Sequence, residues 1–558
     1  MLYGNTAAKP AESFSTATLE LRRKLDQRFK TLDDERRTGE WFEHWRELCE
    51  YMMPRRGRFL LSEDNRGAKY MSKVLDSEGL IASRTLAAGM MAGMSPRSKP
   101  WFRLIPEDKK LVKVHAVKEW LAECESTLYL IFHQSNFYQS IAQLYGELGV
   151  IGTAAMVVFE DWENVIRCET LTVGEYALAQ NSRRICDTMV REYQASLSQL
   201  VEQFGVENLP MTYQERWENG RHGTSVQDLR FPIRHYVGPN PVRNEARPAI
   251  SSNMPFASIY WAPQCGDNQH IIQFKGFEEN ALIAPRWDTT GNDTYGKSPG
   301  MDALPDVKQL QQMTRRFGQG VDRQVNPPMK GPASLKGVAL DLLPGGLNLY
   351  DEAGGKGLES VYGNFRPDLQ AMTAERTRVE GKVNKAMYAD LFFAISQMQG
   401  VQPRQEMELL LRQDEKLGAL GPVVDRIQPE CLDPVIDRAW GVCTRKGVFP
   451  EPPDEISGQP VKVDYISMLA LAQKALGVGN LERYAGVVGN MAGINKDALD
   501  KLNVDGFLDE YAEALGVPPR ATNSDQDVAR IRDSRQQAAQ VEMMAQAAPA
   551  LKDGAAAA

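Results

Sequence analysis

Residues 291–298 contain the strongest candidate for chemistry in this chain of 558 residues. They read Gly-Asn-Asp-Thr-Tyr-Gly-Lys-Ser and match the GxxxxGK[ST] pattern, in which backbone amides at a helix N-terminus hold the phosphates of a nucleotide. The surroundings do not fit, because residues 286–290 are not a buried strand and Pro299 stands where the helix should begin. We therefore predict a surface turn, with a nucleotide-binding loop as the alternative.

The overlapping residues 296–300, Gly-Lys-Ser-Pro-Gly, match the GxSxG pattern of serine hydrolases. No histidine follows Ser298, since the last of the six is His270, so the Ser-Asp-His order of that fold is impossible. Neither an HExxH pattern nor an EF-hand loop occurs, and the histidines are scattered. The sequence thus predicts no catalytic residues, no metal and no cofactor.

Composition narrows the class of protein further. With 65 Lys+Arg against 73 Asp+Glu, the formal net charge of -8 excludes a small, strongly basic nucleic-acid binder. The seven cysteines form no CxxC pair, which favours reduced thiols over a disulfide framework or a zinc site. The N-terminus lacks the apolar region of a signal peptide, and the longest apolar stretch, 144–159, is too short for a bilayer. We expect a protein that is neither secreted nor membrane-spanning.

The first 290 residues mix two periodicities. Apolar residues at helical spacing predict helices over 16–60, 77–95 and 115–150. Short segments rich in aromatic and β-branched residues predict strands, and residues 187–204 read as a strand followed by a helix. The predicted strands are 154–161, 228–237, 256–263 and 270–277. This part of the chain is therefore expected to be a mixed α/β unit.

The centre of the chain predicts two long helices around a small β module. Residues 302–326 place apolar side chains every three or four positions, and Pro327 and Pro328 end that helix. Gly and Pro are frequent in 331–366, which favours a hairpin-like module, and a second long helix is predicted over 367–395. Beyond it, the sequence predicts helices over 404–443, a strand at 461–466, and helices over 468–546 before a low-complexity tail.

Several local strings, taken in series, carry a family resemblance. One is Tyr-Gly-Lys-Ser-Pro at 295–299, directly before the first long helix. The others lie at 77–80, 86–96, 99–102, 404–408, 413–422 and 426–438. Together they resemble the head-to-tail connector, or portal, proteins of short-tailed bacteriophages (podoviruses). In that family a Tyr-Gly-x-Ser-Pro turn leads from the wing into the stem, which accounts for both motif matches without catalysis.

The resemblance implies a mainly helical α+β portal fold that assembles as a dodecameric ring at one vertex of the capsid. DNA would enter and leave through the central channel. The implied parts are a wing (1–300), a first stem helix (301–326), a clip (327–366), a second stem helix (367–395), a channel loop (396–406), a C-terminal part of the wing (407–465), a helical crown (466–546) and a disordered tail (547–558).

The resemblance also implies partners and a location. The partners would be double-stranded DNA, the terminase packaging motor, tail adaptor proteins, the major capsid protein and the scaffolding protein, with no membrane. The protein would be made in the host cytoplasm and would reside in the virion, at the portal vertex. Two other hypotheses are a P-loop-containing DNA-packaging NTPase that uses residues 291–298 and a scaffold or adaptor unrelated to DNA.

Candidate interface residues follow from these expectations. Arg378, Lys382 and Lys385 are four and three apart, so they share one helix face, which could line the channel or could be solvated and paired with Glu375 and Glu380. The channel candidates are Arg376, Arg378, Lys382, Lys385, Gln397, Gln399, Gln402 and Arg404. The clip candidates, which could dock partners or form the clip's own core, are Lys330, Lys336, Leu342, Leu343 and Leu347.

Overall fold

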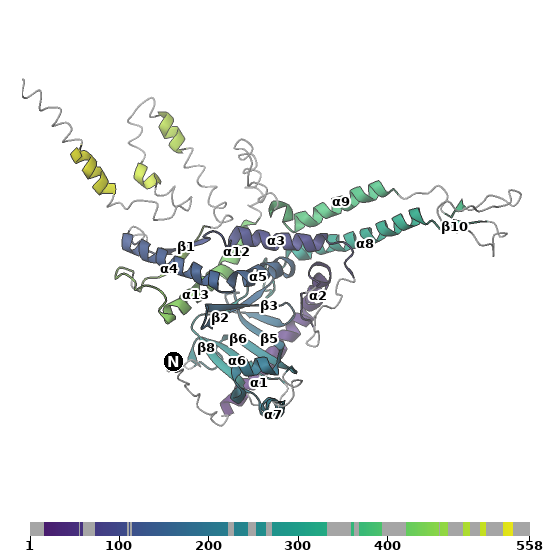
Figure 1. The fold of residues 1–558 in the computed structure, drawn as a ribbon, viewed down its shortest axis with the longest axis horizontal. Coiled ribbons are helices and arrows are strands. Elements are labelled where there is room, and N and C mark those ends of the chain that lie inside the picture. Colours follow the sequence, from purple (N-terminus) through teal and green to yellow (C-terminus); the bar gives the residue numbers. More distant parts are fainter. Residues whose placement is uncertain are drawn as a thin grey trace, which may run out of the picture.

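The computed structural model describes residues 16–54, 56–59, 73–108, 111, 114–220, 228–243, 253–263, 271–331, 359–361, 368–392, 420–456, 458–466, 484–491, 503–508 and 528–538. This part of the chain is mixed α+β and mostly helical. A body of sheets and helices carries a pair of long helices that project to one side (Figure 1). None of the described helices is long and apolar enough to cross a membrane.

The N-terminal region contains two helices rather than the single helical run predicted over 16–60. Helix α1 (Thr16–Thr38) and helix α2 (Trp41–Met52) are separated at Gly39 and Glu40, where Glu40 has a left-handed φ of 61°. The prediction was wrong at this break and beyond residue 52, where the described chain is no longer helical. Apolar residues of α1 are buried against the larger sheet, which fixes the helix along it.

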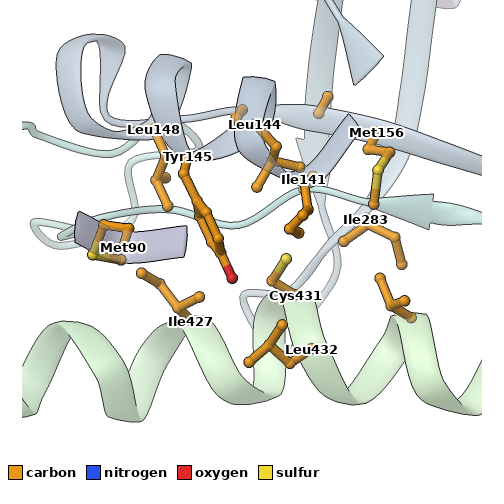
Figure 2. Packing of buried hydrophobic residues seen from close by; sticks show 14 of the residues in the cluster. Met90, Ile141, Leu144, Tyr145, Leu148, Met156, Ile283, Ile427, Cys431 and Leu432 are labelled. Atoms are coloured by element: carbon orange, nitrogen blue, oxygen red, sulfur yellow. The ribbon is translucent and has the colours of Figure 1, made fainter. Parts of the chain in front are cut away.

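Three further helices follow, as the spacing predicts, and the last of them packs against strands of the body. They are α3 (Glu78–Met94), α4 (His115–Gln134) and α5 (Phe137–Ile151). In Figure 2, side chains of α5 face a C-terminal helix across the core. The labelled residues include Leu144, Tyr145 and Leu148 of α5 and, on the opposite side, Ile427, Cys431 and Leu432. These side chains are almost completely buried, and each fully buried apolar side chain contributes about 1.5–3 kcal/mol.

Two antiparallel sheets lie beneath these helices. The smaller has the order β3-β2-β9 and the larger the order β4-β5-β6-β7-β8. Their strands are β2 (Ala155–Asp161), β3 (Val165–Leu171), β4 (Tyr176–Gln180), β5 (Cys186–Ser196), β6 (Arg230–Pro239), β7 (Phe256–Trp261), β8 (Ile271–Phe277) and β9 (Leu282–Ile283). The four predicted strands are confirmed, as is β5 followed by α6 (Leu197–Phe204). Strands β3 and β4 and helix α7 (Met211–Gly220) were not predicted.

The two long helices are α8 (Pro299–Val325) and α9 (Leu369–Ala386), which run side by side (Figure 1). The predicted end of the second helix at 395 was wrong. Helix α9 stops at Ala386, Tyr388 takes a left-handed φ of 54°, and a short helical piece follows over 389–392. This turn directs Phe392 onto Gly89 of α3, where a Cβ on the glycine would approach the ring to 2.1 Å.

The predicted β module is described only at its base. Strand β10 (Met329–Lys330) pairs antiparallel with β11 (Glu359–Ser360), which joins the two ends of the module. The apolar segments predicted within the module lie outside the described residues.

The C-terminal region returns to the body of the protein. Helix α12 (Gly421–Ile427), a π-helix, η7 (Gln428–Leu432), and α13 (Asp433–Lys446) follow one another directly. Strand β12 (Val461–Tyr465), which the sequence predicts, pairs with β1 (Phe102–Pro106), which it does not. The helical prediction for 468–546 is confirmed in the described segments 484–491, 504–508 and 528–538.

Candidate nucleic-acid interface

The motif at residues 291–298 forms the junction between the body and α8. The Ser298 hydroxyl accepts a hydrogen bond from the Met301 amide at 3.0 Å and donates one to the Val150 carbonyl at 2.6 Å. The Gly296 amide donates to Thr153 Oγ1 at 2.7 Å. The predicted surface turn holds for Gly291, Asn292 and Asp293, which are exposed, whereas Ser298 at the end of the motif is only 1% exposed. The junction attaches the start of α8 to the end of α5.

Close backbone contact explains the glycines of this junction. Gly152, at the end of α5, has a φ of +86°, and a Cβ on it would lie 2.3 Å from the Gly296 carbonyl oxygen. A Cβ on Gly296 would lie 2.3 Å from the Gly152 oxygen, and one on Gly300 would lie 2.6 Å from the Val150 oxygen. Glycine is required here so that two backbone segments can touch.

The junction does not present the amides of a phosphate-binding loop. The Lys297 amide donates to the Asp288 carbonyl at 2.7 Å, and the exposed Lys297 ammonium lies 2.8 Å from Asp302. The argument that Pro299 prevents a helix was wrong, because α8 begins at Pro299 and proline is well suited to the first helical position. What excludes phosphate is that protein acceptors already occupy the amides of Gly296 and Lys297.

Lys297→Ala therefore provides a direct test of the nucleotide hypothesis. We expect ATP turnover to stay at background in both the wild-type protein and the variant. The variant should lose less than about 1 kcal/mol of stability, because only a solvent-exposed ion pair is removed. Appreciable turnover that disappears in the variant would contradict this reading of the junction.

Helix α9 carries the cations that the sequence singled out, and they differ in their surroundings. Arg376 lies 3.1 Å from Asp76 and 2.8 Å from Glu380. The Asp76 carboxylate also accepts a hydrogen bond from Thr314 of α8, so Arg376 helps to fasten the two long helices to the segment before α3. Arg376 is thus an anchoring residue, less available to a ligand than the sequence suggested.

The other three cations of α9 are more open. Arg378 Nε lies 2.7 Å from Glu375, and this hydrogen bond holds the pKa of the Glu375 carboxyl below its usual value. Lys382 Nζ lies 3.9 Å from Asp306 of α8, while Lys385 is exposed and forms no ion pair with any described residue. Of the two pairings that the sequence left open for this face, Glu375 pairs with Arg378, whereas Glu380 pairs with Arg376, and a cationic, solvent-facing strip remains.

Two further cations on α8 escaped the sequence reasoning. Arg315 and Arg316 are exposed and form no ion pair within the part of the chain that the structure describes. Their position opposite the apolar stripe of α8 is the sequence feature that could have identified them.

Of the clip candidates, Lys330 is described and is exposed on β10. The candidates Lys336, Leu342, Leu343, Leu347, Gln397, Gln399, Gln402 and Arg404 lie outside the described residues.

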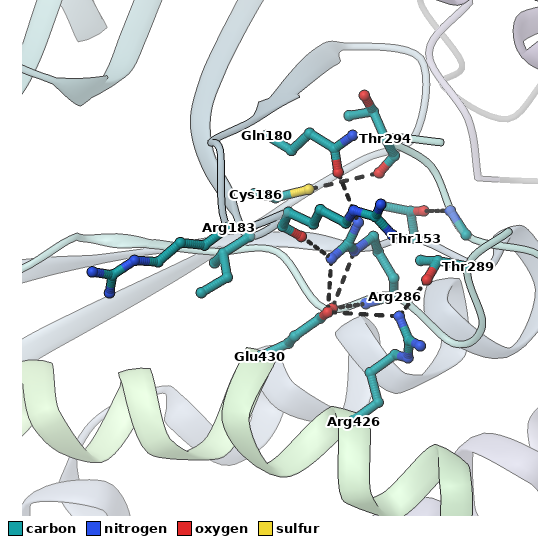
Figure 3. Close-up of polar contacts among 12 residues, drawn as sticks. Thr153, Gln180, Arg183, Cys186, Arg286, Thr289, Thr294, Arg426 and Glu430 are labelled. Carbon is teal, nitrogen blue, oxygen red and sulfur yellow. Dashed lines mark hydrogen bonds and ion pairs between the residues drawn. The ribbon is translucent and has the colours of Figure 1, made fainter. Parts of the chain in front are cut away.

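A buried ion-pair network behind the junction was also missed. The Arg286 guanidinium is 4% exposed and lies 2.8 Å from Glu430 of the π-helix (Figure 3). Glu430 Oε2 also accepts the Arg286 backbone amide at 2.9 Å, and Arg426 donates to Thr289 at 2.5 Å. The network ties the segment that leads into α8 to the helices that follow α9 in the chain. Local spacing gave no signal, since the partners are 144 positions apart.

Comparison with known proteins gives consistent matches over most of the chain. The profile of a family described as "Bacteriophage head to tail connecting protein" matches residues 22–522. The sequence is 36% identical over 510 residues to the portal protein of Salmonella phage epsilon15, covering 90% of each chain. It is 36% identical over 523 residues to the probable portal protein of Bordetella phage BPP-1, covering 93% of this chain and 92% of that one. A chain from the virion of a native gene transfer agent particle aligns with a TM-score of 0.36 at 11% identity, over 83% of this chain and 96% of that chain.

Proposed function

The chain belongs to the family of bacteriophage head-to-tail connecting proteins, and we propose that it assembles into a dodecameric ring that conducts double-stranded DNA. As a portal protein of a tailed phage, it is a structural component of the virion at the portal vertex and not an enzyme. The family thus confirms the predicted role as a head-to-tail connector. Helices α8 and α9 are the proposed stem, with the wing, clip, channel loop and crown divided as the sequence suggested.

The main observation that supports assembly into a ring is the incomplete burial of the apolar stripe on the first long helix. Near the body, Leu304, Val307 and Leu310 of α8 are buried, but the same apolar stripe continues to Val325, which is 72% exposed. Phe317, between these positions, is only partly buried. A single chain therefore covers the far half of the stripe only in part, and neighbouring copies around a ring axis would cover the rest.

The charges of the stem support a channel for DNA. Arg378, Lys382 and Lys385 of α9, together with Arg315 and Arg316 of α8, are exposed at the surface of the helix pair. Repeated around a ring, they would give layers of positive charge along the path of the duplex. Since the whole chain has a net charge of -8, attraction would be confined to these layers, and DNA could slide without being held tightly.

The remaining contacts of the ring are proposed by family membership and the sequence. The channel-loop residues Gln397, Gln399, Gln402 and Arg404 would touch the phosphates of DNA. The clip, with Lys330, Lys336 and the leucines 342, 343 and 347, would dock the packaging motor and later the tail adaptor. The major capsid protein and the scaffolding protein would contact the ring at the vertex.

The test of this function replaces Arg378, Lys382 and Lys385 together by alanine. We expect the variant to form rings with a central hole, seen by electron microscopy, because none of the three side chains is buried. Phages that carry the variant should show a several-fold fall in DNA-filled heads, since the channel loses its phosphate-attracting layers. The amount of DNA per particle measures this effect.

A matched control replaces three exposed cations on α1, Arg23, Lys24 and Lys30, by alanine. This variant changes the net charge equally but lies away from the stem, so its heads should fill normally. Unchanged DNA content in the stem variant would refute the channel-lining role of these residues. Wild-type particles without a ring would refute the proposed function as a whole.

A further inference from the structure

A cleft of 560 Å³ lies between α4, α13 and the loop that leads to β12. In Figure 1, α4 and α13 lie toward the left of the molecule, whereas α8 and α9 project to the right. The cleft is therefore separate from the proposed channel surface. Its walls are mainly apolar, formed by aromatic, proline and aliphatic side chains, and no Lys, Arg or His lines it.

Three aromatic rings build the wall of this cleft. Trp120 and Trp440 meet edge to face with ring centroids 5.9 Å apart, and Trp440 contacts Phe449 at 4.5 Å. The Trp120 indole N–H donates to the Pro450 carbonyl at 3.0 Å, which holds the loop against α4. All three rings are only partly buried, so each keeps part of its surface open to an occupant.

The cleft is lined by acidic residues, and one of their carboxylates has no partner among the described residues. Asp437 of α13 lines it, and its carboxylate forms no hydrogen bond or ion pair with other described residues. Partial desolvation, together with the nearby Asp433 and Glu279 carboxylates, raises the pKa of Asp437 to about 6. Glu451 also lines the cleft, and residues 447–461 contain acidic residues but neither Lys nor Arg. A cation would therefore complement this site.

We propose that this cleft binds an arginine side chain presented by a partner protein. A guanidinium group stacks on aromatic faces and can form two parallel hydrogen bonds to one carboxylate, here that of Asp437. The proline and aromatic walls would cover the aliphatic part of the same side chain. A free amino acid fits less well, because its α-carboxylate would find no positive group among the lining residues.

The test titrates the full-length protein with N-acetyl-arginine methylamide and follows binding by calorimetry. The uncharged citrulline analogue, which has nearly the same shape, should bind roughly fivefold or more weakly. Asp437→Asn should abolish the preference for arginine. Asp454→Asn, in the same loop but outside the cleft, is the matched control and should bind like the wild type. Binding of the arginine probe should strengthen between pH 5 and pH 7 in the wild type and in Asp454→Asn, but not in Asp437→Asn, because Asp437 ionises in that range.

Three outcomes would overturn the proposal. The first is equal binding of the arginine and citrulline probes, and the second is an unchanged affinity in Asp437→Asn. The third is failure of Asp437→Asn to assemble into rings, because the occupant would then be a second copy of this chain rather than a separate partner. The first two results do not bear on the proposed channel, since α13, which contains Asp437, lies away from α8 and α9 (Figure 1).

Discussion

Gly296→Ala is expected to destabilise the protein by about 3 kcal/mol or more. The new Cβ would lie 2.3 Å from the Gly152 carbonyl oxygen and 2.9 Å from the Asp288 carbonyl oxygen. Both obstacles are backbone atoms, so no side-chain rotation can relieve the overlap. The end of α5 and the start of α8 would have to separate, which would also break the hydrogen bond from the Gly296 amide to Thr153. Urea unfolding at neutral pH measures the loss.

Two other glycines provide graded controls for this prediction. Gly291, in the same loop, has a φ of +59° but nothing within 4 Å of an added Cβ, so Gly291→Ala should cost only about 1 kcal/mol of backbone strain. Gly318, within α8, also has open space around it, and Gly318→Ala should stabilise the helix by about 0.5–1 kcal/mol. A Gly296→Ala variant no less stable than Gly291→Ala would show that the junction is not tightly packed.

This prediction also separates two readings of the same sequence pattern. In a phosphate-binding loop, Gly296 would let the backbone approach the phosphates of a ligand, and its replacement would weaken nucleotide binding. In the structure Gly296 serves the contact with Gly152, and its replacement should instead misplace α8. We therefore expect Gly296→Ala to reduce the yield of rings. The pattern alone could not distinguish these readings, because it does not record which acceptors occupy the amides.

The sequence predicted the elements whose signals are local. The apolar stripe of α8 depends on spacing within one helix, and its predicted start at 302 lies three residues from the observed Pro299. The end of α9 could not be predicted in this way. Met387 and Leu391 continue the helical spacing, but the chain turns at Tyr388 because Phe392 packs onto Gly89 of α3, far away in the sequence.

The residues of the candidate interface also differ in whether local spacing or long-range contacts determine their roles. The shared face of Arg378, Lys382 and Lys385 follows from their spacing, and all three are exposed as a common face requires. The different role of Arg376 depends on Asp76, which only the folded chain brings within 3.1 Å. Likewise, nothing near Glu430 in the sequence indicates that it neutralises Arg286. Long-range electrostatic partners are the part of the site that spacing leaves undetermined.

Glu430→Gln is expected to cost about 3–5 kcal/mol of stability, because it leaves the Arg286 charge buried without its counter-ion. The Arg286 guanidinium is 4% exposed and contacts both Glu430 carboxylate oxygens, at 2.8 and 3.2 Å. Its other hydrogen-bond partners among the described residues, the Arg184 carbonyl and the Gln180 side chain, are neutral and cannot replace the lost charge. The substitution preserves the size of the side chain, so the effect reports charge rather than packing.

Glu375→Gln is the matched control, because it removes the carboxylate of an arginine ion pair on the exposed surface of α9. Arg378 and Glu375 are 56% and 44% exposed, so water replaces the lost partner and the unfolding free energy should stay close to that of the wild type. Equal unfolding free energies for the two variants would contradict a buried, desolvated pair at Glu430. In the expected case, the loss at Glu430 should also lower the yield of rings, because the network holds the segment that leads into α8 against the helices that follow α9. The stem would then be anchored at its base by electrostatic contacts as well as by the glycine junction.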